Sequence, residues 1–407
     1  MTFDDFNLIQ PLMRAVREQG FIEPTPVQKQ AIPAVLQGRD MVGTAQTGTG
    51  KTVAYLLPSI QRLIPGEVPA TPRMVVLAPT RELAIQIADE GRNLSRFTRL
   101  RVAAIFGGAS IKDQAKRLRR GVDLVVATPG RLMDHMRRGN VRFDDLEILV
   151  FDEADRMLDM GFLPDIKRIL QQMPSKRQTL LFSATMPQAI LSLSYRFLKD
   201  PVRIEIDTAQ PPAAIQQQIY PVPKHLKIPL LTELLKDNSV ESALVFTRTK
   251  QEADILTRKL KESGLSIAEI HGGFHQKKRI QALQRFRAGK VRILVATNVA
   301  ARGLDIKGIS HVINFDAPDR AENYVHRIGR TGRVQAAGVA WTLVTMEDEP
   351  LISAIEYLLG KEIERVHLPE FDYDVPTPDW AKPSAKTILR NASRNRSSSE
   401  RWKALTR

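Results

Sequence analysis

The sequence of 407 residues contains no cysteine. Disulfide bonds and metal sites built on thiolates are therefore excluded, which fits a reducing compartment. The chain also lacks any apolar run near the roughly 18 residues that a membrane-spanning helix needs. Its start, Met1–Phe6, is acidic and no apolar stretch follows it, so no signal peptide is visible. We expect a soluble, cytoplasmic protein that has no membrane as a partner.

Acids are fewer than bases, and the excess is unevenly placed. The formal net charge is +15, of which +7 falls in residues 381–407, with eight bases against a single acid. The acid is Glu400 and the bases are Lys382, Lys386, Arg390, Arg394, Arg396, Arg401, Lys403 and Arg407. Such a balance favours nucleic acid as the partner, with a merely solubilising basic surface as the alternative. The tail could also bind protein partners.

The length exceeds what one hydrophobic core usually supports, so two domains are expected. Both halves alternate helical patterns, such as Arg81–Arg92 and Leu163–Gln172, with apolar runs of strand length. Runs that are apolar throughout fit parallel strands covered on both faces, so each half is predicted to be a βαβ-type open sheet. The runs are Met74–Ala78, Leu124–Ala127, Ile148–Phe151, Thr179–Phe182, Ala243–Phe246, Ile267–Ile270, Ile293–Ala296, His311–Phe315 and Val339–Val344.

The domain boundaries follow from changes in composition. Residues 207–216 lack periodicity and contain a Pro-Pro pair, which predicts a linker between an N-terminal domain at 1–206 and a C-terminal domain at 217–370. From residue 371 the chain becomes Pro-rich and then Ser/Arg-rich, which predicts a disordered basic tail.

Unusual polar residues directly follow the apolar runs. Those that begin the polar stretches are Pro79, Thr128, Asp152, Ser183, Thr247 and Thr297. In open α/β sheets, ligands bind beyond the carboxyl ends of the strands. We therefore expect one functional edge on each sheet, and a cleft where the two edges face each other.

Ala45–Thr52 has the spacing of a phosphate loop, with Ala45 where the first glycine usually stands. The glycines would let backbone N–H groups turn toward phosphate oxygens, and the helix expected after them would direct its N-terminus at the anion. Lys51 would face the β- and γ-phosphates, and the Thr52 hydroxyl would bind Mg²⁺. The remaining predicted phosphate contacts are Gln46, Thr47, Gly48, Thr49 and Gly50. A chance Gly/Thr-rich turn is the alternative.

Asp152-Glu153 follows the apolar run Ile148–Phe151. The first carboxylate could hold the metal and the second could polarise an attacking water, which predicts hydrolysis of a nucleoside triphosphate. A solvated helix start is the alternative. Phosphoryl transfer also needs positive charge on the transition state, and Arg330 and Arg333 are candidate arginine fingers. Ordinary surface arginines are the alternative there.

In identity, order and spacing these motifs resemble those of the DEAD-box ATP-dependent RNA helicases of superfamily 2, whose signature is Asp152-Glu153-Ala154-Asp155. The resemblance covers roughly Phe3 to Leu368, and the basic tail on a compact core resembles the bacterial RhlE-like type. It implies two tandem RecA-like domains, each a mostly parallel sheet flanked by helices. It also implies ATP, Mg²⁺ and single-stranded RNA bound across the cleft between them.

The activity that the resemblance implies is an RNA-dependent ATPase and helicase that locally unwinds short RNA duplexes or remodels RNA–protein complexes. An ATP-gated RNA clamp with little unwinding is the alternative. A GTPase is disfavoured because no Asn-Lys dipeptide exists for guanine recognition. A DNA translocase is disfavoured only by the resemblance. A zinc site is not expected, because Gly272 and Gly273 lie between His271 and His275 and argue against a helix face, and no further ligand is nearby in the sequence.

The resemblance also assigns roles by position. Gln28 would read the adenine edge and Phe21 would stack on the base, with Phe3 and Thr25 as further contacts; packing of this segment as an N-terminal cap is compatible with that reading. Asp305 would lie near the ribose. The residues that would couple hydrolysis to domain closure are Asp155, Ser183, Thr185 and His326.

The implied RNA contacts go mainly to the sugar-phosphate backbone, so little sequence specificity is expected. In the first domain they are Pro79, Thr80, Arg81, Gly107, Gly108, Thr128, Gly130 and Arg131. In the second they are Arg248, Gln276, Arg279, Thr297, Asn298, Arg302 and Gly303. Asn298 stands where the family commonly has aspartate, and we expect this change to tune RNA contact rather than abolish it.

Overall fold

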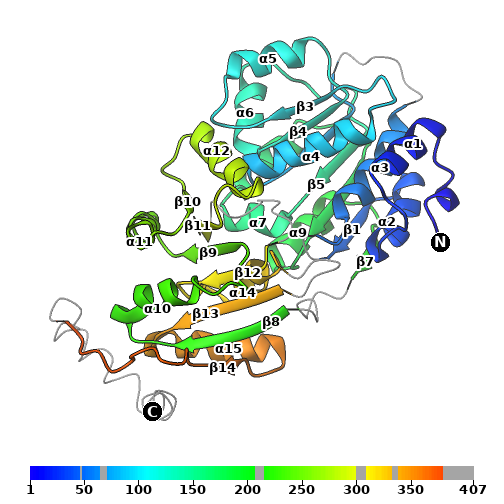
Figure 1. Cartoon of the computed structure of the whole chain (residues 1–407). Helices are drawn as coiled ribbons and strands as arrows, with labels where there is room; N and C mark the ends of the chain where they lie inside the picture. Colours follow the sequence, from blue (N-terminus) through cyan, green and yellow to red (C-terminus); the bar gives the residue numbers. More distant parts are fainter. Residues whose placement is uncertain (46–47, 65–70, 207–214, 299–308, 332–337, 379–407) are drawn as a thin grey trace. The chain divides into compact units, whose positions relative to one another are not determined.

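A computed structural model describes residues 1–45, 48–64, 71–206, 215–298, 309–331 and 338–378 (Figure 1). The chain divides into two compact units, Met1–Thr208 and Ala209–Arg407. Within the described ranges, no helix is both long enough and apolar enough to cross a membrane.

The first unit is built on a seven-stranded sheet whose strand pairs are all parallel. Neighbouring strands follow the order β3-β4-β2-β5-β6-β1-β7. Adjacent residues such as Val75 and Val76 enter cores on opposite faces, which explains why the central strands are apolar throughout. In chain order the strands are β1 (Met41–Thr44), β2 (Met74–Leu77), β3 (Val102–Ile105), β4 (Leu124–Ala127), β5 (Ile148–Phe151), β6 (Gln178–Ser183) and β7 (Val202–Glu205).

Helices cover both faces of this sheet. One face carries η1 (Asp4–Phe6), α1 (Gln10–Glu18), α2 (Pro26–Leu36), α3 (Lys51–Leu63) and α4 (Arg81–Leu94). The other carries α5 (Ile111–Arg119), α6 (Pro129–Arg137), α7 (Ala154–Asp159), α8 (Leu163–Leu170) and α9 (Gln188–Phe197). Helix α3 continues through Pro58, which the sequence marks as a site of interruption.

The second unit is built on another seven-stranded parallel sheet, with the order β10-β11-β9-β12-β13-β8-β14. Its strands are β8 (Ile215–Pro221), β9 (Ala243–Thr247), β10 (Ile267–Ile270), β11 (Ile293–Thr297), β12 (His311–Asn314), β13 (Gly338–Val344) and β14 (Glu364–Arg365). Counted from its own first strand, the order is the same as in the first unit.

Helices also cover both faces of the second sheet. One face carries η2 (Lys224–Leu226), α10 (Lys227–Leu234) and α11 (Lys250–Glu262). The other carries α12 (Gln276–Arg287), α14 (Ala321–Ile328) and α15 (Glu349–Leu359), which η3 (Met346–Asp348) precedes. The prediction of two α/β units with parallel sheets flanked by helices is therefore confirmed.

Two expectations about the ends of the second unit are wrong in part. Ile215 and Gln216, assigned to the linker, open β8, because Ile215 is buried and pairs with Gly338. The tail is also ordered at its start. Phe371 and Tyr373 pack against the core of the α10–α11 face, and the Leu368 N–H donates to the Tyr373 hydroxyl at 3.0 Å. Residues 379–407 lie outside the described ranges.

Candidate functional site

The order of strands in the first sheet sorts the predicted motifs into two adjacent groups. Strands β5, β6 and β1 are neighbours, and their carboxyl ends lead to Asp152, to Ser183 and to the phosphate loop. Strands β3, β4 and β2 are also neighbours, and their ends lead to Gly107, Thr128 and Pro79. Because parallel strands end at one edge, the motifs predicted to bind ATP lie beside those predicted to bind RNA.

The lysine of the phosphate loop is held inside the loop. Lys51 begins α3 and is buried, and its Nζ donates to the Ala45 carbonyl at 2.7 Å. Thr52 follows it in the first turn of the helix and is half-buried. A cation and a hydroxyl therefore stand at a helix N-terminus, an arrangement that suits a phosphate group. Gln46 and Thr47 lie outside the described residues.

Gln28 connects the segment before β1 to the phosphate loop. Its Oε1 accepts the Thr25 N–H at 2.9 Å, and its Nε2 donates to the Gly50 carbonyl at 3.2 Å. Gly48 and Gly50 both have a φ of +91°, a left-handed conformation that side chains rarely adopt. A Cβ on Gly50 would also lie 2.6 Å from Gln28 Nε2, so the close approach requires glycine.

Phe3 lies behind Phe21 rather than beside it on the surface. The ring centroids are 6.2 Å apart in a stacked arrangement, and Phe6 packs edge-on against Phe3 at 6.0 Å. Phe3 is only 3% exposed, whereas Phe21 is half-buried. The structure therefore supports Phe3 as a backing for Phe21 and offers no open face of Phe3 to a base.

Asp152, the first acid of the signature, is 3% exposed and bonded to a tyrosine. The fully buried Tyr55 hydroxyl on α3 donates to Asp152 Oδ2 at 2.8 Å. Burial raises the pKa of the Asp152 carboxyl, and the charge of Lys51 opposes that rise. Burial, followed by the charge of Asp152, raises the pKa of Tyr55 well above its usual value, so the hydroxyl keeps its proton.

Glu153, the second acid, has a left-handed backbone with φ of +53° and caps α7. Such a conformation is uncommon for a residue with a side chain and is often found at functional positions. The carboxylate forms an ion pair with Arg156 one turn later, and both side chains are buried. The ion pair holds the carboxylate in one direction.

The predicted coupling residues of the first unit form a hydrogen-bonded group. Asp155 Oδ2 accepts from both the backbone N–H and the hydroxyl of Thr185, each at 2.9 Å. The Asp155 N–H in turn donates to Ser183 Oγ at 3.1 Å. The first turn of α7 is therefore tied directly to the end of β6 and to the loop that follows it.

The three RNA-type motifs of the first unit also converge. A Cβ on Gly108, which has a φ of +81°, would lie 2.1 Å from Arg81 Nη1, so the guanidinium packs on the glycine backbone. The Arg131 guanidinium donates to the Ala109 carbonyl at 2.9 Å. Two arginines, from the first turns of α4 and α6, thus flank the Gly107-Gly108 turn and create a positive surface there.

In the second unit, Asn298 is engaged within the protein. Its Oδ1 accepts from Arg327 Nε at 2.7 Å, and Arg327 also donates to Asn314 Oδ1 at 2.8 Å. The carbonyl oxygen of Asn298 thus holds a buried arginine that lies three residues before Arg330, and the RNA contact of Asn298 stays a prediction. Arg330 is also buried.

The remaining predicted contacts of the second unit are described only in part. Arg248 is exposed just beyond the end of β9, and its backbone N–H donates to Asp316 Oδ2 at 2.9 Å. Arg279 is half-buried on α12, and Thr297 ends β11. Residues Arg302, Gly303, Asp305 and Arg333 lie outside the described ranges, as do the side chains of Gln276 and His326.

Comparison with known proteins identifies the family. The DEAD/DEAH box helicase family matches residues 25–193, and the helicase conserved C-terminal domain matches residues 226–335. The DEAD-box ATP-dependent RNA helicase CshA of Bacillus subtilis is 44% identical over 373 residues, which are 91% of this chain and 75% of CshA. This chain belongs to the DEAD-box ATP-dependent RNA helicases.

Other relatives agree with this assignment. The helicase is 44% identical to the ATP-dependent RNA helicase RhlB of Pseudomonas syringae over 89% of its own length and 93% of RhlB. Among solved structures, Saccharomyces cerevisiae Dbp5 bound to RNA and ADP BeF3 is 32% identical, with a TM-score of 0.83, over 90% of the helicase and 95% of Dbp5. The helicase is thus an ATP-hydrolysing enzyme that acts on RNA, while its RhlE-like subtype stays a prediction.

Two residues of the ATP group of the helicase were missed by sequence reasoning. Tyr55 follows Lys51 by four positions on α3, and Arg156 follows Glu153 by three. These spacings do not reveal the contacts, because Tyr55 bonds to Asp152, which is distant in the chain, and Glu153 lies before α7 with a left-handed backbone. Buried Lys227, which shares Asp348 with Arg248, was also missed, because its partners Asp316 and Asp348 are distant in the chain.

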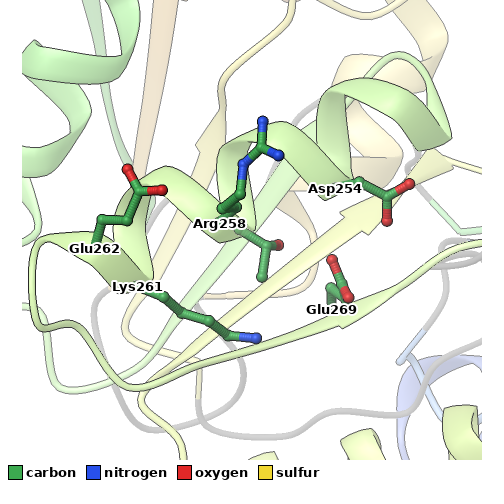
Figure 2. Close-up of a pocket in the computed structure, with 6 residues that line it drawn as sticks. Asp254, Arg258, Lys261, Glu262 and Glu269 are labelled. Atoms are coloured by element: carbon green, nitrogen blue, oxygen red, sulfur yellow. The ribbon is translucent and has the colours of Figure 1, made fainter.

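A polar cluster of the second unit is built from residues to which the sequence assigned no role in ATP or RNA binding. Asp254 and Glu269 line an open cavity of about 510 Å³, and their side chains are labelled in Figure 2. Their oxygens and a His271 nitrogen lie within 4.8 Å of one another, so further metal-type ligands do lie near His271, contrary to the sequence argument.

The hydrogen bonds of His271 disfavour a metal at this cluster. Its Nδ1 accepts the Gly273 N–H at 3.1 Å, which puts the proton of a neutral ring on Nε2, 2.9 Å from Asp254 Oδ1. The nitrogen that faces the two acids is then a donor rather than a ligand. Lys278 Nζ also lies 3.9 Å from Glu269. That the helicase binds no zinc remains a prediction.

Proposed function

We propose that this helicase uses ATP to separate short RNA duplexes locally or to displace proteins from RNA. The observation that carries the proposal is the bonding of Asp155 to Thr185 and Ser183. A change at the acidic pair would pull on the loop after β6 through these bonds. ATP hydrolysis would thereby be linked to a movement of the chain, as unwinding requires.

The ATP group would divide the work among its side chains. Thr52 and Asp152 would hold Mg²⁺, because hydroxyl and carboxylate oxygens are the ligands this cation prefers, and Mg²⁺ would supply charge on the β- and γ-phosphates. Lys51 would add a second positive charge, and Glu153 would orient the attacking water. Gln28 would select adenine through the side-chain N–H and the oxygen lone pair that do not contact the backbone of Thr25 and Gly50.

The second unit would complete the reaction site with Arg330 and Arg333, which would neutralise charge that develops on the transferred phosphoryl group. RNA would lie along the Arg81 and Arg131 surface of the first unit and the Arg248 edge of the second. Arginine, hydroxyl and glycine amide groups suit phosphates and sugars, so we infer weak dependence on base sequence.

The test measures ATP hydrolysis with and without single-stranded RNA, together with displacement of a strand from a short duplex. We expect RNA to raise turnover by at least about tenfold, because the loss of one transition-state charge costs at least that much. The Glu153→Gln variant should bind ATP normally and fail to turn it over. Equal turnover with and without RNA would contradict the proposal.

An ATP-gated clamp is the second candidate, because the proposed contacts hold the sugar-phosphate backbone of the RNA and do not read its bases. It predicts tight, ATP-dependent RNA binding together with little strand displacement. The same duplex assay, run beside an RNA-binding assay, distinguishes the two functions. Binding without displacement would replace the unwinding proposal by the clamp.

A further inference from the structure

The phosphate loop and the acidic pair place two opposite charges in one buried region. Lys51 is 5% exposed and Asp152 is 3% exposed. Opposite charges attract strongly where water is excluded. Yet among the ion pairs of the described residues none joins Lys51 to Asp152, although the charge of Lys51 does act on the Asp152 carboxyl. Something in the fold must keep the two groups apart.

Each charge is held by a neutral partner instead. Lys51 Nζ donates to the Ala45 carbonyl at 2.7 Å. Asp152 Oδ2 accepts from the Tyr55 hydroxyl at 2.8 Å. Tyr55 is itself fixed, because it is fully buried and its ring packs on Phe182 with centroids 5.2 Å apart. The hydroxyl therefore sets the rotation of the Asp152 carboxylate from a rigid position on α3.

We propose that Tyr55 is a positioning residue of the ATP site, which holds the Asp152 carboxylate toward the cation and away from Lys51. The proposal rests on the proposed role of Asp152 as a Mg²⁺ ligand. Without the hydroxyl, Asp152 would turn toward Lys51. The two charges would then partly neutralise each other, and the nucleotide and the cation would each lose a partner.

Two effects of the hydroxyl oppose each other, and their sizes decide the direction. A donor on the carboxylate withdraws charge and so weakens its attraction for a cation. A hydrogen-bond partner that orients a metal-binding side chain, in contrast, typically strengthens metal affinity or activity by about 10- to 100-fold. A carboxylate left without its donor is also free to form the competing pair with Lys51. We therefore expect loss of the hydroxyl to weaken the site.

The test compares Tyr55→Phe with Ser59→Ala. Both variants remove one buried hydroxyl from the same helix, but Ser59 Oγ, which is fully buried, has no hydrogen-bond partner among the residues that the structure describes. The first readout is binding of a non-hydrolysable fluorescent ATP analogue as Mg²⁺ is titrated, without RNA. For Tyr55→Phe we expect the half-saturating Mg²⁺ concentration to rise about tenfold, and kcat to fall by a similar factor. Ser59→Ala should leave both unchanged.

A third variant, Asp152→Asn, separates this inference from the proposed function. If Asp152→Asn shifts the Mg²⁺ requirement and Tyr55→Phe does not, the positioning role is overturned while the proposed function stands. If neither variant shifts it, the assignment of Asp152 as a ligand fails, and the inference fails with it. A Tyr55→Phe change confined to melting temperature, with normal Mg²⁺ dependence, would reduce Tyr55 to a structural residue.

Discussion

At the scale of single residues, His135 ties the stability of the first unit to pH. Its side chain is completely buried, with Nε2 3.2 Å from Gln114 Oε1 and Nδ1 3.2 Å from Asn140 Nδ2. An amide nitrogen can only donate, so Nδ1 accepts and the ring is neutral. Burial lowers the pKa of His135, and the charges of Arg131 and then Arg138 lower it further, although Asp134 opposes them.

The expected consequence is a loss of stability in mild acid. Above the ordinary histidine pKa of 6.5 the ring is neutral in both the folded and the unfolded chain, and its full contribution is present. As the pH falls from there to the lower folded pKa, only the unfolded chain takes up the proton. The free energy of unfolding then drops by up to about 1.4 kcal/mol per pH unit. Urea unfolding between neutral and mildly acidic pH would measure this slope.

His135→Gln should flatten that slope, because it removes the titrating group and keeps polar atoms in the network. His275→Gln provides the control, since His275 is exposed. A slope that is the same in wild type and His135→Gln would rule out the effect.

Asn298 makes a second prediction at this scale. Its Oδ1 accepts from Arg327 Nε, and Arg327 is only 3% exposed. A hydrogen bond to a buried charged group contributes about 1.5–3 kcal/mol. Asn298→Ala should therefore lower the unfolding free energy of the second unit by about that amount, whereas Asn298→Asp should retain it. Chemical unfolding of the three proteins measures the difference; equal stability of the alanine variant would show that the contact contributes nothing.

At the scale of elements, the packed start of the tail is part of the second unit. Phe371 and Tyr373 meet edge-on with centroids 4.9 Å apart, and His225 Nε2 lies 2.9 Å from the Val375 carbonyl. A chain that ends at Pro378 should therefore unfold like the full chain. A chain that ends at Leu368 should lose about 2 kcal/mol, the burial of two half-covered aromatic rings. Equal melting of the two truncated chains would mean that the segment only rests on the surface.

Elements also differ in how far the sequence predicts them. Central strands such as β4 and β5 are apolar throughout because helices cover both faces, and the predicted bounds of both are confirmed. Strand β8 was missed because exposed and buried residues alternate at its start, after a Pro-Pro pair. Strand β1 was also missed, because it contains Gly43 and a glycine usually indicates a break in a strand. Glycine is required there, since an added Cβ would lie 2.8 Å from the Phe182 ring.

Residues of the candidate site also differ in how far the sequence predicts them. Motif residues such as Thr128 and Asp152 stand at the ends of predicted strands, where parallel sheets gather ligand-binding groups, whereas the phosphate loop follows β1 and was found by its spacing alone. The partners that hold those residues, such as Tyr55 on Asp152 and Arg156 on Glu153, depend on side-chain directions and lie in helices without unusual composition. Contacts between residues distant in the chain, such as Arg327 with Asn298, require the folded structure.

At the scale of the whole molecule, the two units have the same strand order, but the net charge is distributed unevenly along the chain. Residues 381–407 carry +7 of the net +15. The RNA contacts predicted in the two units depend on where individual side chains lie, whereas a charged tail can attract RNA without a fixed arrangement of its side chains. Its contribution should therefore come mainly from release of counterions and depend steeply on salt.

Deleting residues 381–407 should weaken binding of single-stranded RNA at low salt and flatten its salt dependence. Each phosphate contact contributes about 0.7 to the slope of log affinity against log salt, so losing most of the eight bases should reduce the slope by about 4 to 5. Fluorescence anisotropy over a salt series measures both quantities. Replacing Ser397, Ser398 and Ser399 by alanine changes the tail without changing its charge and should leave the slope intact. If the deletion preserves the slope, RNA is held by the two units alone, and the excess charge serves another partner.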